Sequence, residues 1–289
     1  MSARSVRRFR EEERGGGAQV TERQGQDDAH HLPARDEPRR LRVAIDGPAG
    51  AGKGTVARGL AERLGYLLVD TGAIYRAVAL AARRASLTWE EEGEIGALAE
   101  DLARGGRIAL ERSPHGMPPD SSAPPPANAP AQSSLGGSGM RVLLDGEDVS
   151  SAIRAPEISL GASRVSAIPA VRKALLAMQR QAGAGGGVVL EGRDIGTVVF
   201  PDAEVKFFLT APAEIRAKRR YDELVARGMP VSFEATLSDV LRRDKADSER
   251  AVAPLRKADD AILVDSGHRS PQEIIDEMAT LVEIRARGG

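Results

Sequence analysis

The sequence of 289 residues contains no cysteine and very few aromatic residues. The absence of cysteine excludes disulfides, thiolate metal sites and a cysteine nucleophile. Phe, Trp and Tyr make up only 3% of the residues, so a folded core must rest on Leu, Val, Ile and Ala. Histidine is scarce too, and its scattered positions argue against a zinc site; these are His30, His31, His115 and His268.

An excess of charge of one sign is also lacking, as are long apolar runs. The formal net charge is −1, which argues against a globally basic nucleic-acid binder but does not exclude a local basic pocket. No apolar run approaches the roughly 20 residues of a membrane span, and the N-terminus lacks the apolar stretch of a secretory signal. We therefore expect a cytoplasmic protein that binds neither nucleic acids nor membranes.

Two segments have the composition of unstructured chain. Residues 1–40 mix charged residues, Gly and Gln with few apolar residues, so they cannot bury enough surface to offset the entropy of ordering. We interpret them as a disordered N-terminal extension or a misassigned start, and docking of nucleic acid or a partner is the alternative.

Residues 113–139, with the run Pro124-Pro125-Pro126, lie between strand-like segments at 107–111 and 141–144. We expect a flexible insertion at a hairpin tip, and a Pro-rich ligand for a partner domain is the alternative.

The remaining sequence alternates short apolar runs with helical patterns. The apolar runs have the length of buried strands and lie at 41–45, 66–69, 187–190, 205–209 and 262–264. Helices are predicted at 55–64 and 170–181, after Pro212, and after the capping signals Thr88-x-x-Glu91 and Ser270-Pro271-x-Glu273. Unbroken apolar strands that alternate with helices predict a parallel sheet covered by helices on both faces.

A glycine-rich loop joins the first predicted strand to the first predicted helix, as a phosphate-binding P-loop requires. Its glycines let the backbone curl so that amide N–H groups point at phosphate oxygens, and the following helix adds the positive end of its dipole. The alternative is an ordinary glycine-rich turn that happens to contain a lysine. The loop comprises Gly47, Pro48, Ala49, Gly50, Ala51, Gly52, Lys53, Gly54 and Thr55.

The end of this loop departs from the usual pattern. Ser or Thr normally follows the lysine directly and supplies a magnesium ligand, whereas here Gly54 intervenes and the hydroxyl belongs to Thr55. We therefore expect Mg²⁺ to be held mainly through water rather than by a direct protein ligand. Thr55 and Glu191, an acid that ends the apolar run at 187–190, are the candidates for such indirect contact, with Asp46 second. A solvent-exposed strand-end acid is the alternative for both carboxylates.

Further segments narrow the class of P-loop protein. The Asn-Lys-x-Asp signature of GTPases is absent, and the Gly-Lys-Gly-Thr ending resembles that of nucleoside-monophosphate kinases. Four segments resemble, in order, the pattern of bacterial cytidylate kinases: Asp70-Thr71-Gly72-Ala73-Ile74-Tyr75-Arg76, residues 145–150, residues 191–202 and residues 243–255. The resemblance spans about 41–281. Departures are Thr71 in place of a frequent Ser, Glu191 in place of a common Asp, and Ala246 where Arg can stand.

This resemblance implies an α/β P-loop NTPase fold, in which a five-stranded parallel sheet is flanked by helices within a core at 41–289. It also implies an inserted monophosphate-binding subdomain at about 105–155, containing a small antiparallel sheet, and a short lid at 212–232. The implied reaction transfers the γ-phosphoryl group of ATP to CMP or dCMP, with Mg²⁺, in a monomeric enzyme.

Site residues carry over from the same resemblance. Phosphoryl transfer brings two polyanions together, and arginine suits such a site because its planar fork binds phosphate through two parallel hydrogen bonds. The implied catalytic residues are Lys53, Arg193, Arg216 and Arg220, with Arg219 a less certain neighbour of the last two. The implied substrate-binding residues are Thr71, Arg76, Ser163, Arg172, Arg193, Asp194, Arg243, Asp247 and Arg250.

Each assignment has a plainer alternative. Arg216 and Arg220 lie four residues apart on one face of a predicted helix and could be solvated surface charges, and the aspartates could be structural ion-pair partners or helix caps. At the level of function, the alternatives are a P-loop kinase for another acceptor, such as UMP, AMP or a metabolite hydroxyl, and a non-catalytic nucleotide-binding module that docks a partner.

Overall fold

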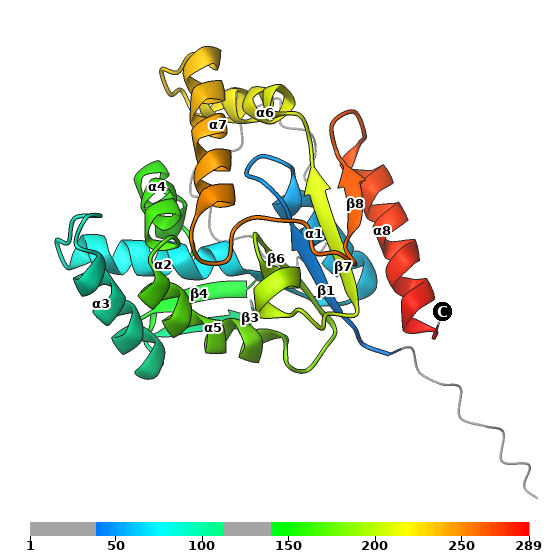
Figure 1. The fold of residues 1–289 in the computed structure, drawn as a ribbon, viewed down its shortest axis with the longest axis horizontal. Coiled ribbons are helices and arrows are strands. Elements are labelled where there is room, and N and C mark those ends of the chain that lie inside the picture. The colour runs from blue at the N-terminus through cyan, green and yellow to red at the C-terminus, as the bar shows by residue number, and fades with distance from the viewer. Residues whose placement is uncertain (1–38, 113–139, 289) are drawn as a thin grey trace, which may run out of the picture. The chain divides into compact units, whose positions relative to one another are not determined.

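The computed structural model describes residues 39–112 and 140–288. The interpretations of residues 1–38 and 113–139 lie outside these ranges. Within them, the alternation of strands and helices predicted from the sequence is confirmed (Figure 1). Each predicted strand is present, with ends that lie within two residues of the apolar run that predicted it.

The larger sheet has five parallel strands in the order β2-β6-β1-β7-β8, which confirms the predicted fold class. Because all strands run in the same direction, their carboxyl ends meet at one edge of the sheet. The strands are β1 (Arg42–Asp46), β2 (Leu67–Asp70), β6 (Val188–Gly192), β7 (Val205–Thr210) and β8 (Ile262–Asp265).

The central strands β1, β6 and β7 are largely buried on both faces, as unbroken apolar strands require, whereas the edge strand β8 is mostly exposed. Along β1, Val43 and Ile45 pack into a core with α1 (Lys53–Leu64) and α8 (Pro271–Ala286). Ala44 points to the opposite face, where a second core includes Leu190 and residues of the π-helical turn η2 (Ile195–Val199). The alternation of neighbouring side chains between two cores fixes the register of the strands.

A three-stranded antiparallel sheet, β3-β4-β5, accompanies the larger sheet. It consists of β3 (Ile108–Arg112), β4 (Met140–Leu144) and the short β5 (Glu147–Asp148), and Arg112 stands directly opposite Met140. Its buried residues share a core with α2 (Thr71–Arg84), α3 (Glu92–Arg104), the 3₁₀ turn η1 (Ala152–Arg154), α4 (Pro156–Val165) and α5 (Pro169–Gly183).

Two helices form a hairpin above the carboxyl edge of the large sheet (Figure 1). They are α6 (Ala213–Ala226), which begins after Pro212 as predicted, and α7 (Phe233–Glu249). The lower end of α7 approaches the centre of the molecule, so residues near its C-terminus lie beside the strand ends.

Local sequence signals differ in how well they predict the structure. The capping box at Ser270 and Glu273 is present in full, and Gly65 occupies the left-handed position after α1, with φ of 63°. The capping signal at Thr88-x-x-Glu91 is wrong as a helix start. Glu91 accepts hydrogen bonds from the Thr88 amide and hydroxyl, but these residues form a separate turn before α3, whose first helical residue is Glu92.

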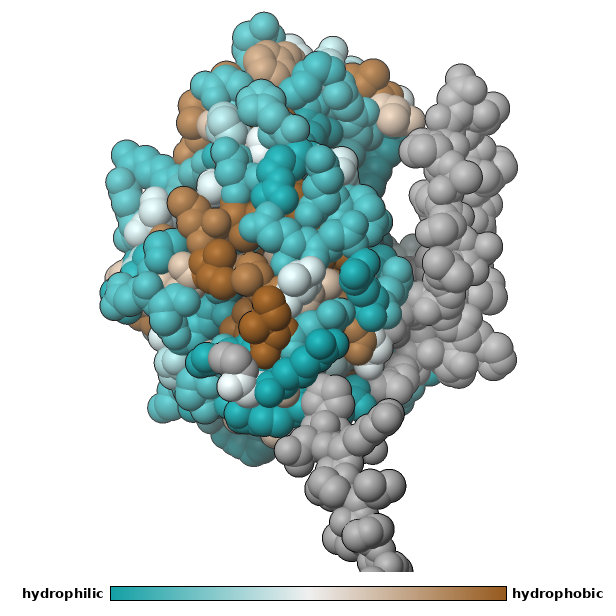
Figure 2. Space-filling view, turned by 90° about the vertical axis from the view of Figure 1, so that its right-hand side faces the viewer, coloured by the Kyte–Doolittle hydropathy of each residue, from teal (hydrophilic) through white to brown (hydrophobic). Residues whose placement is uncertain are grey.

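No helix in the described ranges is long and apolar enough to cross a membrane. Figure 2 shows a patch of apolar side chains on the side of the molecule that carries β8 and α8. On these two elements the large apolar side chains with substantial exposure are Ile262, Leu263 and Ile284.

Candidate active site

The carboxyl edge of the large sheet gathers three acidic residues and the glycine-rich loop. Asp46, Asp70 and Glu191 close β1, β2 and β6, and the loop leaves the sheet directly after Asp46. Ligands of open parallel sheets bind at this edge, where the chain turns from strands into loops and helix N-termini.

Two carbonyl groups of the loop from Gly47 to Gly52 accept hydrogen bonds from a lysine. The ammonium of Lys53 donates to the main-chain oxygens of Gly47 and Pro48, each at 2.8 Å. Gly52 has φ of 87° and caps α1, which begins at Lys53. This conformation needs glycine, and it directs the first amide groups of α1 toward the concave side of the loop.

Lys53 is buried, and burial lowers the pKa of its ammonium well below the ordinary lysine value. The positive charges of Arg193 and Arg243 lower this pKa further, whereas Glu191 opposes the shift. Lys53 therefore lies within the electrostatic field of groups on β6 and α7, far from it in sequence.

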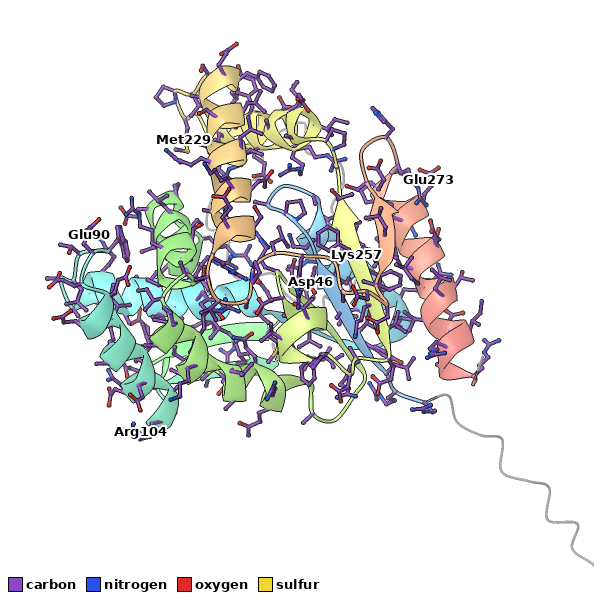
Figure 3. All side chains as sticks on the ribbon, in the orientation of Figure 1. Asp46, Glu90, Arg104, Met229, Lys257 and Glu273 are labelled. Atoms are coloured by element: carbon purple, nitrogen blue, oxygen red, sulfur yellow. The ribbon has the colours of Figure 1, made fainter. Side chains whose placement is uncertain are left out.

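Asp46 supports the local backbone structure. Its carboxylate accepts hydrogen bonds from the backbone amides of Ile195 at 2.8 Å and Gly196 at 2.7 Å. Burial raises its pKa to about 6 despite these bonds. Asp46 therefore fixes the turn η2 against the end of β1, at the centre of the view in Figure 3.

Glu191 points its carboxylate toward the start of α1. A Cβ added to Gly54 would lie 3.5 Å from Glu191 Oε1, so the two residues face each other. Burial, followed by repulsion from Asp70, raises the pKa of Glu191 to about 7. Within 39–112 and 140–288, no group of three or more His, Cys, Asp or Glu side chains could hold a metal ion by itself.

Three guanidinium groups converge beside these acids. Arg193 donates from Nε to Asp247 at 3.0 Å, and Arg76 pairs with Asp70. Arg243 is half-buried, and desolvation together with the charge of Arg193 lowers its pKa to about 10. The Nε atoms of Arg76 and Arg243 are buried and lack an acceptor in the described part of the chain. Buried donors of this kind mark a place for an anion.

A second charged cluster lies deeper in the molecule. Asp194 pairs with the buried Arg172 and lies 3.4 Å from the guanidinium of Arg250. Burial raises the pKa of Asp194, and the two arginines oppose that shift. Arg172 also lies over the ring of Tyr75 and donates to the main-chain oxygen of Ser166 at 3.3 Å. One acid between two arginines leaves this cluster with excess positive charge.

A family model described as cytidylate kinase matches residues 43–284. The chain belongs to the cytidylate kinase family.

Three relatives illustrate the similarity, and each is named cytidylate kinase. The proteins from Syntrophotalea carbinolica and Geobacter sulfurreducens are 49% and 47% identical, over 86% of this chain and 94% and 95% of their own lengths. The protein from Carboxydothermus hydrogenoformans is 45% identical, over 86% of this chain and 98% of its own length. The predicted resemblance to cytidylate kinases is confirmed, and with it an ATP-dependent phosphotransferase activity toward CMP or dCMP.

The fold brings together most of the residues predicted for the site. The loop, Thr71, Arg76, Arg193, Asp194 and the α7 residues meet at the carboxyl edge, although they are separated by up to about 200 residues in sequence. The hydroxyl of Thr71 is already used, because it donates to the main-chain oxygen of Glu191 at 2.8 Å. Ser163 lies in the last turn of α4, and its carbonyl accepts from Ser166, which contacts Arg172.

The two predicted lid arginines have different surroundings. Arg220 is partly exposed and pairs with Glu223 on its own helix, at 2.9 Å. Arg216 is buried and is held by Asp244, Ala211 and Ala49, so it is not a solvated surface charge.

Arg219, the less certain neighbour of the two predicted lid arginines, lies beside Ser266, which no sequence motif had indicated. Arg219 donates to the main-chain oxygen of Ser266 at 2.6 Å, and both line a pocket of about 200 Å³ together with Gly52, Thr55 and Arg269. The signal available in the sequence was the spacing of Arg219 after Pro212, but Ser266 follows an ordinary strand end and carries no motif.

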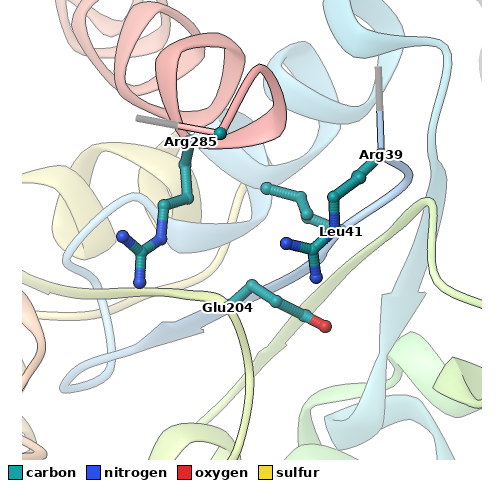
Figure 4. A pocket seen from close by; sticks show the side chains of 5 residues that line it. Arg39, Leu41, Glu204 and Arg285 are labelled. Atoms are coloured by element: carbon teal, nitrogen blue, oxygen red, sulfur yellow. The ribbon is translucent and has the colours of Figure 1, made fainter. Parts of the chain in front are cut away.

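A further pocket, of about 320 Å³, lies at the opposite edge of the sheet (Figure 4). Arg39, Leu41, Glu204 and Arg285 line it. Glu204 accepts from the backbone and side chain of Arg42. This pocket lies at the amino end of β1, away from the residues of the candidate active site.

Proposed function

We propose that the loop at 47–55 holds the phosphates of ATP and that Arg76, Arg193 and Arg243 hold the phosphate of CMP or dCMP. The observation that carries this proposal is the pair of buried Nε donors on Arg76 and Arg243, which lack an acceptor within the described ranges. The charges of Arg193 and Arg243 act on Lys53, so the two phosphate sites adjoin. A phosphate oxygen would satisfy these donors and neutralise the surplus positive charge.

The reaction joins the acceptor phosphate to the γ-phosphorus of ATP. An oxygen of the CMP phosphate forms the new P–O bond, the bond from the γ-phosphorus to the β–γ bridging oxygen breaks, and ADP leaves with that electron pair. The second pKa of a phosphate monoester is about 6, so the nucleophile is already ionised near neutral pH and needs no strong base. Lys53 and the arginines then stabilise charge on the transferring group and hold the two nucleotides in line.

The pocket beside the loop suits the base of ATP. It is bordered by the guanidinium plane of Arg219, by Ser266 and by the start of α8 at Pro271. Arginine planes stack on aromatic rings, so we assign the adenine to Arg219. Arg220, one residue along α6, exchanges its surface partner Glu223 for a phosphate of ATP in this proposal.

The buried cluster around Asp194 suits the cytidine. Cytosine presents an exocyclic amine and a ring carbonyl, which match a hydroxyl or carboxylate acceptor and an arginine donor respectively. We assign the base to Ser163 and Arg172 and the sugar to the neighbourhood of Asp194, Asp247 and Arg250. Arg172 has one acid partner, so its remaining donors can serve the ligand.

The site also fits Mg²⁺ held mainly by phosphate oxygens and water. The carboxylate of Glu191 faces the start of α1 and accepts no hydrogen bond from any described residue, while burial and Asp70 disfavour its negative charge. A cation would relieve this repulsion, and an acid with hydroxyl neighbours such as Thr55 suits a hydrated Mg²⁺. When bound, Mg²⁺ supplies charge neutralisation on the phosphates.

Two parts of the chain would adjust to the nucleotides in this proposal. They are the segment at about 105–155, which contains β3, β4 and η1, and the segment at 212–232, which contains α6 and its turn. We further propose that the protein acts as a monomer. Both nucleotides are cytoplasmic metabolites, which supports activity in the cytoplasm.

An acceptor panel tests the proposal. Release of ADP from ATP is measured with CMP, dCMP, UMP, AMP and no acceptor, each with Mg²⁺ and with chelator. We expect ADP release that depends on CMP or dCMP and on Mg²⁺. An acceptor that exceeds CMP more than about tenfold in kcat/KM contradicts the cytidine site. Tight ATP binding without phosphotransfer would favour a nucleotide-binding module instead.

A further inference from the structure

The carbonyl groups of the phosphate loop are held by side chains from three separate elements. Lys53 on α1 holds Gly47 and Pro48. Arg216 on α6 donates from NH1 to the Ala49 oxygen at 3.0 Å. The hydroxyl of Ser266, after β8, lies 2.8 Å from the Ala51 oxygen. Because the C=O and N–H of one trans peptide point in opposite directions, the donors that hold the Ala49 and Ala51 oxygens also fix the directions of the Gly50 and Gly52 amides.

Arg216 is immobilised more fully than an arginine that waits for a ligand. Its Nε donates to the Ala211 oxygen at 2.8 Å, and its two terminal nitrogens bind both carboxylate oxygens of Asp244 at 2.9 and 2.6 Å. With the bond to Ala49, four of its five N–H groups are engaged in a side chain that is only 6% exposed. Only one N–H remains, so the two parallel hydrogen bonds by which arginine usually holds a phosphate would require breaking this set.

The loop also packs against the backbone of Arg216. A Cβ added to Gly50 would lie 3.1 Å from the Cβ of Arg216 and 3.3 Å from its main-chain oxygen. The crest of the loop, Ala49 and Gly50, therefore rests on the first turn of α6. A shift of this turn would move the loop.

Asp244 connects this arrangement to the acceptor side. It lies on α7 next to Arg243 and three residues before Asp247, which binds Arg193. Through Asp244, Arg216 ties the helix that carries Arg243 to the loop that carries Lys53. The ion pair of Arg216 and Asp244 therefore links the phosphate loop to the helix that carries the acceptor-side residue Arg243.

We propose that Arg216 is a positioning residue, which acts through the Ala49 carbonyl and Asp244 to fix the phosphate loop and its separation from Arg243. It does not itself bind a phosphate. This role rests on the proposed function for its effect on turnover, but the loop geometry it predicts can be measured without an acceptor.

The test compares Arg216→Lys, Asp244→Asn and the double variant with two exposed controls on the same helices, Lys218→Met and Asp239→Asn. Both single variants should lower kcat about 10- to 100-fold, since small misplacements at a transfer site have effects of this size. The double variant should lose little more than either single one, because each breaks the same link. The controls should match the unmodified protein.

Readouts independent of the acceptor are the amide NMR shifts of Gly50 and Ala51 and the affinity for ADP. Asp244→Asn should move these amide shifts in the same direction as Arg216→Lys. The proposal is overturned if Asp244→Asn keeps full kcat while Arg216→Lys loses tenfold, since Arg216 would then act on a phosphate. It is also overturned if both variants lower only the thermal stability. If CMP proves not to be the acceptor, the ADP and NMR results still decide the role of Arg216.

Discussion

Asp70 and Glu191 are register partners at the carboxyl ends of the parallel strands β2 and β6. Asp70 has partners of its own, since it binds Arg76 and caps α2 through the amide of Ala73. The negative charge of Glu191 is compensated less well than that of Asp70. Burial and the charge of Asp70 raise the pKa of Glu191 to about 7. The strand register thus leaves one acid half-protonated near neutral pH, next to the phosphate loop.

This pKa predicts a pH-dependent stability of the nucleotide-free protein. The folded pKa of about 7 exceeds the ordinary value of 4.5, so the folded state binds more protons than the unfolded state between these values. Stability from Glu191 is therefore present below pH 4.5 and is lost as the pH rises toward 7. In Glu191→Gln this loss disappears, so the variant should gain about 3 kcal/mol over the parent at pH 8, or roughly 6–12 °C in Tm.

The measurement is thermal unfolding at pH 5 and pH 8 without nucleotide. The difference between Glu191→Gln and the parent should be small at pH 5 and large at pH 8. Glu62→Gln, an exposed acid on α1, serves as the matched control and should show no such dependence. An equal difference at both pH values would show that the pKa of Glu191 is ordinary.

Lys53→Met should nearly abolish turnover and leave the fold intact. The side chain keeps its length, but the transferring phosphoryl group loses the ammonium proposed to stabilise its charge, which predicts a decrease of kcat of about 100- to 1,000-fold. Steady-state kinetics and circular dichroism measure the two effects. Lys245→Met, at an exposed position on α7, is the control. Turnover within threefold of the parent would refute the role given to the loop.

Gly47→Ala should unfold the protein or destabilise it by more than about 3 kcal/mol. Gly47 has φ of 150°, and an added Cβ would lie 1.9 Å from the main-chain oxygen of Leu209 on β7. Neither backbone can move without breaking strand pairing. Gly93→Ala makes the same chemical change in α3, where nothing lies within 4 Å, and should stabilise by about 0.5–1 kcal/mol. Urea unfolding compares the two, and similar midpoints would contradict the steric argument.

Replacing residues 113–139 by a short Asn-Gly turn should change kcat less than about twofold. Arg112 and Met140 stand opposite each other in the β3–β4 pair, so the strand ends are already close enough for a tight turn. The same acceptor assay measures the result. A collapse of kcat with an unchanged unfolding temperature would show that the replaced segment belongs to the site.

The sequence was sufficient to predict the large sheet because its central strands are buried on both faces. Val43, Val189 and their neighbours must be apolar in such a position, and the runs they form are visible without any tertiary information. The loop could be predicted from the sequence equally well, because phosphate binding restricts it to a short, contiguous motif. The capping signal at Thr88 misled because a turn can use the same Thr–Glu hydrogen bonds as a helix start.

The contacts of the site residues could not be predicted from the sequence in the same way. Arg216 is separated by 167 positions from Ala49 and by 28 from Asp244, and a helical arginine has the same local pattern whether it is buried or solvated. Likewise, nothing near Ser266 indicates that its hydroxyl reaches Ala51, 215 positions away. Such contacts depend on how helices pack above the sheet, which local periodicity does not encode.

The last strand of the sheet has a bearing on self-association. Among the described residues β8 forms one edge of the sheet, and Leu263, exposed at 60%, is the kind of residue that lets an open edge recruit another chain. This edge is only four residues long, follows Asp259 and ends at Asp265. If two copies paired along this edge with their strands parallel and in register, these carboxylates would lie next to their counterparts, and their repulsion would oppose the pairing.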